Sequence, residues 1–160
     1  MPSFRSGDAA GDPHRDAVYR AEHDALPDGG RRFRRFSELE AWVEQVVLGP
    51  AWEALFPDAP LEVAVLRRSR GATFSAAHVT PDGDAAAVWI RDGSWDAATV
   101  VHELAHVAAG PSPEPTGPHG ARFATALLRL WRELLGVHAY GALRSALEVH
   151  GVPYQRDALG

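Results

Sequence analysis

Apolar residues recur at helical spacing in the segment that follows residue 36. One helical stripe would hold Leu39, Trp42, Val43, Val46 and Val47. Ser37 and Glu40 stand at the spacing of a capping box, which would begin this helix, and Gly49 with Pro50 would end it. The pattern therefore predicts an amphipathic helix over residues 37–48.

The two ends of the chain carry weaker patterns. Residues 1–11 are small and polar, and we expect them to be disordered. A helix is predicted from Asp12 to Ala25, with Asp12 as its cap and Pro13 in its first turn. We expect residues 12–154 to form a single domain and residues 155–160 to form a flexible tail.

The middle of the chain has the pattern of β-strands. Short runs rich in Val, Leu, Ala and Ile cover residues 61–66, 73–79 and 85–90. The turn residues 81–84 separate the last two runs, so we expect a hairpin there. A sheet of about three strands is enough to pack helices on one face.

In the last third of the chain, apolar residues again recur at helical spacing. Helices are predicted over 95–109 and 119–135, with a Pro-rich loop at 110–118, and a weaker helix over 140–150. Together these patterns predict an α+β fold with N-terminal helices, a three-stranded sheet and two consecutive helices after it.

Composition narrows the possible functions. The 160 residues suit one domain with its own core, and the absence of Cys removes thiol catalysis and Cys-based zinc sites. A net charge of −5 lacks the basic footprint of a nucleic-acid binder. We interpret the arginine clusters at 31–35 and 67–70 as solvated faces, with a phosphate-binding patch as the alternative. Because there is no signal peptide and no apolar run of about 20 residues, we expect a cytoplasmic protein that does not enter membranes.

The segment that carries chemistry is His102-Glu103-Leu104-Ala105-His106. Residues four apart lie on one face of a helix, so His102 and His106 can reach one cation together. Glu103 projects about 100° from His102, where it can reach a metal-bound water rather than the metal. The flanking residues are apolar almost all round, so this helix should be buried, and buried polar groups need a partner.

His119 is the candidate third ligand. It lies 13 residues after His106, at the start of the next predicted helix, where Gly120 would let the two backbones approach closely. Phe123 would pack against the first helix and orient His119. The alternatives are that His102 and His106 are ordinary core or surface histidines and that His119 only caps its helix. The remaining histidines lack such spacing and are expected at the surface or in packing: His14, His23, His78, His138 and His150.

Three imidazoles without a fourth protein ligand are typical of a catalytic zinc site, because structural sites are usually closed by four ligands. We therefore expect one Zn²⁺ per chain, held by His102, His106 and His119, with Glu103 as general base. Asp96 and Glu114 are candidates for orienting the imidazoles. Weaker candidates for oxyanion stabilisation are Arg122, His138, Tyr140 and Tyr154.

These residues resemble a known family. The HELAH segment at 102–106, followed by His119-Gly120-x-x-Phe123, is similar to minimal zincins grouped around SprT-like and WLM-type metallopeptidases. The similarity is greatest to small metallohydrolases of high-GC actinobacteria. The resemblance implies a zincin-like fold, with His102, His106 and His119 as zinc ligands and Glu103 as catalytic acid/base. Family members often carry a further His after HELAH, where this chain has Val107.

Two functions remain open at this stage. The first is a zinc metallopeptidase acting on a peptide or protein, which would lie along the sheet edge at residues 85–90 by strand addition. The second is a non-catalytic zinc-binding module for protein or DNA partners. The sequence leaves the oligomeric state open.

Overall fold

The sheet places the hairpin beside a parallel strand. The computed structural model describes residues 12–111 and 117–159, and within them the strands are β1 (Glu62–Arg68), β2 (Ala76–Val79) and β3 (Ala85–Arg91). β2 and β3 pair antiparallel, which confirms the predicted hairpin, and β1 pairs with β3 in parallel. The strand order is β1-β3-β2. The expectation that residues 85–90 form a sheet edge was wrong, because β3 is hydrogen-bonded on both sides.

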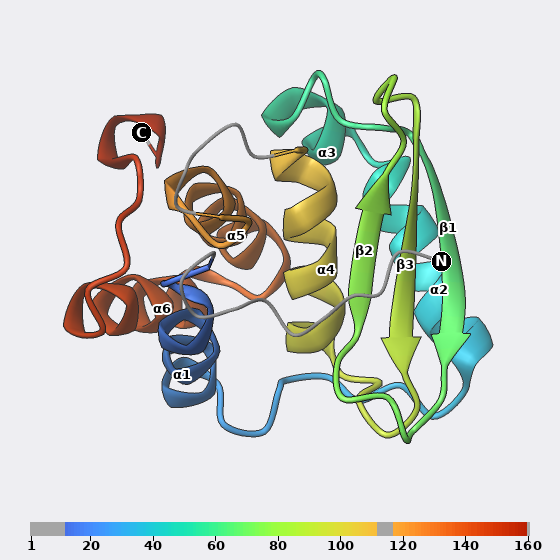
Figure 1. Cartoon of the computed structure of the whole chain (residues 1–160), viewed down its shortest axis with the longest axis horizontal. Helices are drawn as coiled ribbons and strands as arrows, with labels where there is room; N and C mark the ends of the chain where they lie inside the picture. Colours follow the sequence, from blue (N-terminus) through green and yellow to red (C-terminus); the bar gives the residue numbers. More distant parts are fainter. Residues whose placement is uncertain (1–11, 112–116, 160) are drawn as a thin grey trace.

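The described residues also contain six α-helices. They are α1 (Arg15–Ala25), α2 (Phe36–Val47), α3 (Pro50–Leu55), α4 (Ala97–Ala109), α5 (Ala121–Leu134) and α6 (Val137–Val149). Figure 1 shows α4 in the middle of the molecule, with the sheet on one side and α1, α5 and α6 on the other. The α+β class predicted from the sequence is confirmed.

The core explains why α4 is apolar nearly all round. One face of β3, formed by Ala86, Val88 and Ile90, is buried. Nine of the thirteen residues of α4 are also buried, because the helix is covered on both sides. A helix in this position has almost no solvent-facing stripe. Its polar residues must therefore satisfy one another or a ligand.

Helix caps differ from those predicted. α2 begins at Phe36 without a side-chain cap, so Ser37 and Glu40 lie inside the helix and the predicted capping box is absent. α1 begins after His14, and Asp12 does not cap it. α4 is capped by Asp96, whose Oδ1 accepts a hydrogen bond of 2.9 Å from the backbone N–H of Thr99.

The described residues reach almost to the C-terminus. Residues 156–159, expected to belong to a flexible tail, form a 3₁₀ helix, and Arg129 of α5 donates a hydrogen bond from Nε to the carbonyl of Ala158 at 3.0 Å. The predicted disorder of residues 1–11 lies outside the described residues. Within the described chain, the helices are too short or too polar to traverse a lipid bilayer.

Candidate metal centre

Three histidines converge beside the middle of α4. His102 and His106 stand one turn apart on that helix, and His119 comes from the segment directly before α5. One ring nitrogen of each lies within 4.8 Å of the others, and Nε2 of His102 is 3.2 Å from Nε2 of His119. His102 and His119 are almost fully buried, whereas His106 is partly exposed. The structure thus brings together all three histidines expected from the sequence.

Buried carboxylates fix two of the three rings. The Nδ1 of His102 lies 2.6 Å from Oε1 of Glu22 on α1. The Nδ1 of His119 lies 2.7 Å from Oδ2 of Asp12, just before α1. A carboxylate can only accept here, so each Nδ1 carries the hydrogen. The Nε2 atoms of both rings are therefore the free nitrogens, directed toward the common centre. Metal-binding histidines are commonly held by carboxylates in this way.

This arrangement requires a positive charge between the rings. Two bare imidazole nitrogens 3.2 Å apart present lone pairs to each other, so either a proton or a cation must lie between them. Two nitrogens bound to one tetrahedral zinc, each at ~2.0–2.1 Å, would be about 3.3–3.4 Å apart. The carboxylates of Asp12 and Glu22 add buried negative charge that a divalent ion would offset. His102 and His119 thus stand at a separation that suits one metal ion, and the three histidines together could hold one.

Aromatic side chains pack around the imidazoles. The ring of Phe123 contacts all three, with centroid distances of 5.0 Å to His102, 4.3 Å to His106 and 4.8 Å to His119. On the other side, the ring of Tyr19 stacks on His102 at 4.8 Å with an interplanar angle of 12°. These contacts limit the rotation of the rings, so the centre is preorganised.

Protonation in the metal-free protein follows from burial and these neighbours. Burial alone would lower the pKa of His102, but the Glu22 carboxylate more than offsets this, and the pKa is raised. Burial and then the neighbouring His102 lower the pKa of His119 to about 4. Burial and both other imidazoles lower the pKa of His106 well below its usual range. Of the three imidazoles, His102 is thus the one that binds a proton most readily in the metal-free protein.

Glu103 has the properties of a proton acceptor. It is buried, and this burial raises the pKa of its carboxyl group to about 7, although the charge of His102 acts in the opposite direction. A carboxyl group with this pKa can both take up and release a proton near neutral pH. Burial also raises the pKa of the nearby Tyr19, so the phenol stays protonated.

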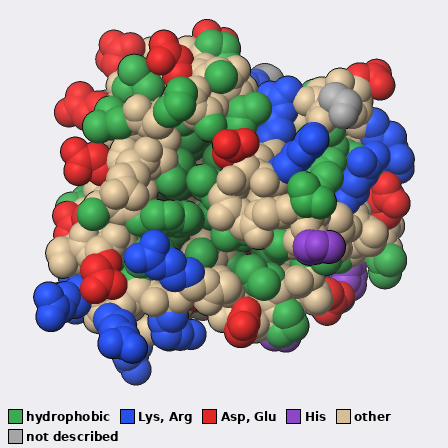
Figure 2. Space-filling view, turned by 180° about the vertical axis from the view of Figure 1, so that it is seen from behind, with side chains coloured by type: hydrophobic (Ala, Val, Ile, Leu, Met, Phe, Trp, Pro, Cys, Tyr) green, Lys and Arg blue, Asp and Glu red, His purple; other side chains and the backbone are tan. Residues whose placement is uncertain are grey.

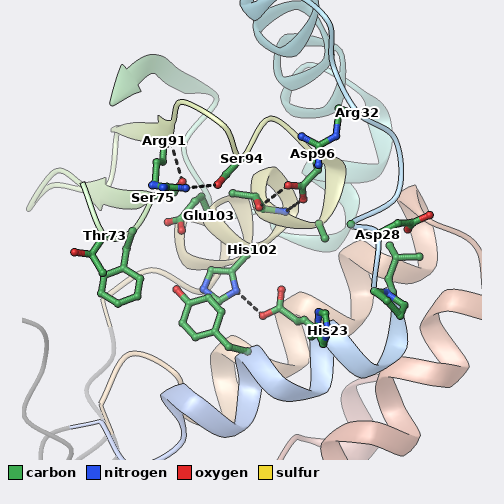
Figure 3. A pocket seen from close by; sticks show the side chains of 18 residues that line it. His23, Asp28, Arg32, Thr73, Ser75, Arg91, Ser94, Asp96, His102 and Glu103 are labelled. Atoms are coloured by element: carbon green, nitrogen blue, oxygen red, sulfur yellow. Dashed lines mark hydrogen bonds and ion pairs between the residues drawn. The ribbon is translucent and has the colours of Figure 1, made fainter. Parts of the chain in front are cut away.

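A cavity of about 340 Å³ leads to this carboxylate. Figure 3 shows Glu103 and His102 among the side chains that line it, together with Thr73, Ser75 and Arg91. Its far end is the N-terminus of α4, where Gly29 has a positive φ of 76° and comes so close to Asp96 that an added Cβ would lie 2.7 Å from Oδ1. The cavity gives a ligand a route from the surface to Glu103.

Other residues suggested by the sequence lie elsewhere. Asp96 caps α4 instead of orienting a histidine, and Glu114 falls outside the described residues. Arg122 and His138 are exposed. The hydroxyl groups of Tyr140 and Tyr154 both accept hydrogen bonds from Arg144, so they serve the packing of α6 and the chain end.

The sequence did not reveal three residues of the centre: Asp12 in its real role, Tyr19 and Glu22. A signal for Glu22 was present, because it shares the spacing of the buried residues Val18 and Ala21 on α1. An acid on the buried stripe of an amphipathic helix should have a partner. No comparable signal exists for Asp12, whose partner is 107 positions away.

Comparisons with known protein families, with curated proteins and with solved structures find no match to this chain. Function therefore has to be inferred from the residues of the site.

Proposed function

We propose that this protein is a zinc-dependent hydrolase that cleaves peptide bonds. The observation that carries the proposal is the convergence of His102, His106 and His119, two of them oriented by carboxylates, beside the buried carboxyl group of Glu103. Among the described residues this group contains three ligands, which leaves a coordination position for water. That arrangement favours catalysis over a purely structural role.

Each residue then has a defined task. A zinc ion bound by the three histidines would supply a water of lowered pKa and polarise the scissile carbonyl. Glu103 accepts a proton from the attacking water and passes it to the leaving amine. Glu22 and Asp12 keep Nδ1 of their histidines protonated, so that Nε2 remains available. Tyr19 holds the plane of His102.

The proposed architecture is that of a minimal zincin. The order of elements supports it, because the HExxH helix α4 follows a small sheet and is followed by the helix that brings the third histidine. The HELAH and HGxxF segments support the relation to SprT-like and WLM-type metallopeptidases.

The substrate path proposed here follows β2 and not β3. β2 is an edge strand next to α4, and the segment 73–75 before it lines the cavity that reaches Glu103. An extended peptide can add to such an edge through main-chain hydrogen bonds. Strand addition at β2 would therefore bring a peptide bond toward Glu103.

The test separates binding from chemistry. Purified protein should contain one zinc per chain by elemental analysis, and Glu103→Gln should keep the zinc while hydrolysis of a peptide library falls by about 10³-fold or more. The exposed Glu53→Gln on α3 is the matched control and should retain full activity. A Glu103→Gln variant that hydrolyses like the wild type would overturn the role of Glu103 as general base. A wild type with zinc and no hydrolysis of any peptide would leave the non-catalytic zinc-binding module as the better proposal.

A further inference from the structure

The sheet has a second open edge, opposite β2. β1 pairs only with β3, and no described residue forms a backbone hydrogen bond with its other edge. A long strand edge can pair with another chain unless charges, Pro or a bulge block it. β1 has seven residues, and its central residues 63–66 are uncharged and contain no Pro. This edge is therefore able to accept a further strand.

A cavity of about 390 Å³ lies between this edge and α2. Its apolar lining includes the buried Val43 and Val47 of α2 and the half-buried Val63 and Val65 of β1. Side chains of a strand alternate between its two faces. A strand added to β1 would therefore direct every second side chain toward α2, where the cavity can receive one that is apolar.

Exposed leucines extend this apolar surface. Leu48 and Leu61 line the cavity and are 66% and 53% exposed, and Leu66 of β1 is 44% exposed. The other large hydrophobic side chains exposed in the described part of the chain are Val137 and Val149, both on α6. Apolar side chains that gather on one surface indicate an interaction site, whereas scattered ones do not.

The charged residues that line the cavity are all acidic. They are Glu40 and Glu44 of α2 and Glu62 of β1, and each is exposed. None of the three forms an ion pair with another described residue. The groove therefore combines an apolar floor with uncompensated negative charge, which is complementary to a segment that is both apolar and cationic.

The arginines nearest in sequence stand at the other end of the groove. Arg35 precedes Glu44 by nine residues, or about 13 Å along the helix axis. Arg67 follows Glu62 by five residues, or about 16 Å along the strand, and is paired with Asp92 at 3.0 Å. Both separations exceed the Debye length of about 10 Å at about 0.1 M salt. Figure 2 shows this side of the molecule at its left, with acidic and hydrophobic side chains above and basic ones below.

The packing of α2 decides between two occupants of this edge. α2 packs on β1, so a second copy that paired its own β1 here by a two-fold axis would bring its α2 onto the same face. The two helices would then lie over strands only about 4.8 Å apart, whereas packed helices need about 8–10 Å. A single extended segment brings no helix with it, and strand addition is an established way to bind one.

We propose that the groove between α2 and β1 binds an extended segment of a partner protein, which joins the sheet beside β1. The segment would place an apolar side chain in the cavity and Lys or Arg side chains beside Glu40, Glu44 and Glu62. This inference is independent of the proposed hydrolase function, because the groove contains no residue of the candidate metal centre and lies at the edge opposite β2.

The test uses the full chain and fluorescent peptides of alternating Val and Thr that end in Lys-Lys, Gln-Gln or Glu-Glu. The Lys-Lys peptide should bind about fivefold tighter than the Gln-Gln peptide, which is the effect expected of two exposed ion pairs, and the Glu-Glu peptide should bind most weakly. Added Lys-Lys peptide should also slow amide hydrogen exchange at residues 62–66, because strand addition protects the open edge.

Charge variants test the acidic lining. Glu40→Gln with Glu44→Gln should reduce the preference for Lys-Lys over Gln-Gln to less than about twofold. Glu53→Gln with Glu133→Gln changes the charge equally at exposed positions of α3 and α5 and should preserve the preference.

Apolar variants test the surface beside the charges. Leu48→Ser with Leu61→Ser should weaken the Lys-Lys and Gln-Gln peptides alike, by about tenfold. Val137→Ser with Val149→Ser removes the comparable exposed side chains of α6 and should leave both affinities unchanged.

Three outcomes would overturn the inference. Equal affinity for the Lys-Lys and Gln-Gln peptides, or no binding of either up to about 1 mM, would remove the cationic segment as the occupant. Binding without slower exchange at residues 62–66 would remove strand addition at β1. A wild type that sediments as a dimer, and as a monomer after Leu48→Ser with Leu61→Ser, would show that a second copy covers the groove. Peptide binding should be the same with chelator present, so these results do not depend on whether the protein is a zinc hydrolase.

Discussion

The two histidines on α4 sit one turn apart but in different surroundings. His102 is buried, stacked on Tyr19 and bonded to Glu22. His106 is partly exposed, rests on Phe123 and has no carboxylate partner in the part of the chain described. The same residue type on the same helix therefore serves two purposes. His102 anchors α4 to α1 with or without a metal, whereas His106 contributes mainly when a metal is bound.

The largest expected effect is the difference in stability between alanine variants of these two histidines in the metal-free protein. His102→Ala leaves the Glu22 carboxylate buried without its partner, and we expect a loss of about 3–5 kcal/mol in the free energy of unfolding. His106→Ala removes a ring with no buried ionic partner and should cost less than about 2 kcal/mol. Urea denaturation in the presence of a chelator measures both.

A second substitution serves as the control for this pair. Adding Glu22→Leu to His102→Ala removes the stranded carboxylate and should recover part of the loss. Equal destabilisation by the two alanine variants would show that the Glu22 contact contributes nothing, and the anchoring role of His102 would be lost.

The next effect concerns how the stability of the metal-free protein depends on pH. Burial raises the pKa of Glu103 from 4.5 to about 7, so the folded state binds this proton more tightly than the unfolded chain. The stabilising contribution is complete below pH 4.5 and is lost as the pH rises through about 7. At 1.36 kcal/mol per unit, the ionised carboxylate costs roughly 3 kcal/mol above about pH 8.

Glu103→Gln should therefore be more stable than the wild type by roughly 3 kcal/mol above about pH 8 and similar to it near pH 4. Thermal unfolding across this pH range with chelator present provides the measurement. A constant difference between the two proteins at every pH would contradict a raised pKa for Glu103.

A smaller effect tests whether the carboxylate bonded to His102 increases the affinity of the site for zinc. Glu22→Gln keeps an oxygen that can accept from Nδ1 of His102 but removes the charge, and zinc affinity should fall by about 10–100-fold. Competition with a zinc-sensitive dye measures this directly. Asp24→Asn is the matched control, because Asp24 is also on α1 and also bonds a histidine, His150, at 2.7 Å, but at the exposed surface. Its zinc affinity should not change.

Features that depend on residues close in sequence could be predicted, whereas features that depend on contacts between distant segments could not. The helices, the hairpin and the pair His102 and His106 depend on residues close in sequence, and periodicity revealed them. The parallel pairing of β1 with β3 depends on contacts between distant segments, so β3 was mistaken for an edge. The bond between Asp12 and His119 spans 107 positions, and local rules gave Asp12 a capping role that it does not have. The predicted capping box at Ser37 does not form, because α2 begins at Phe36 and Ser37 therefore lies inside the helix.

The smallest expected effect distinguishes the Asp96 carboxylate, which caps α4, from the Glu22 carboxylate, which bonds a candidate metal-binding histidine. Asp96→Ala removes the N-terminal cap of α4 and should cost about 1 kcal/mol of stability. Ser37→Ala, at the predicted cap that the structure lacks, should change stability by only a few tenths of a kcal/mol. Because Asp96 bonds Thr99 and no histidine, zinc affinity should remain that of the wild type, in contrast to Glu22→Gln. A loss of zinc affinity in Asp96→Ala comparable to that of Glu22→Gln would mean that the position of α4, more than the carboxylate contacts of its histidines, determines how tightly the metal is held.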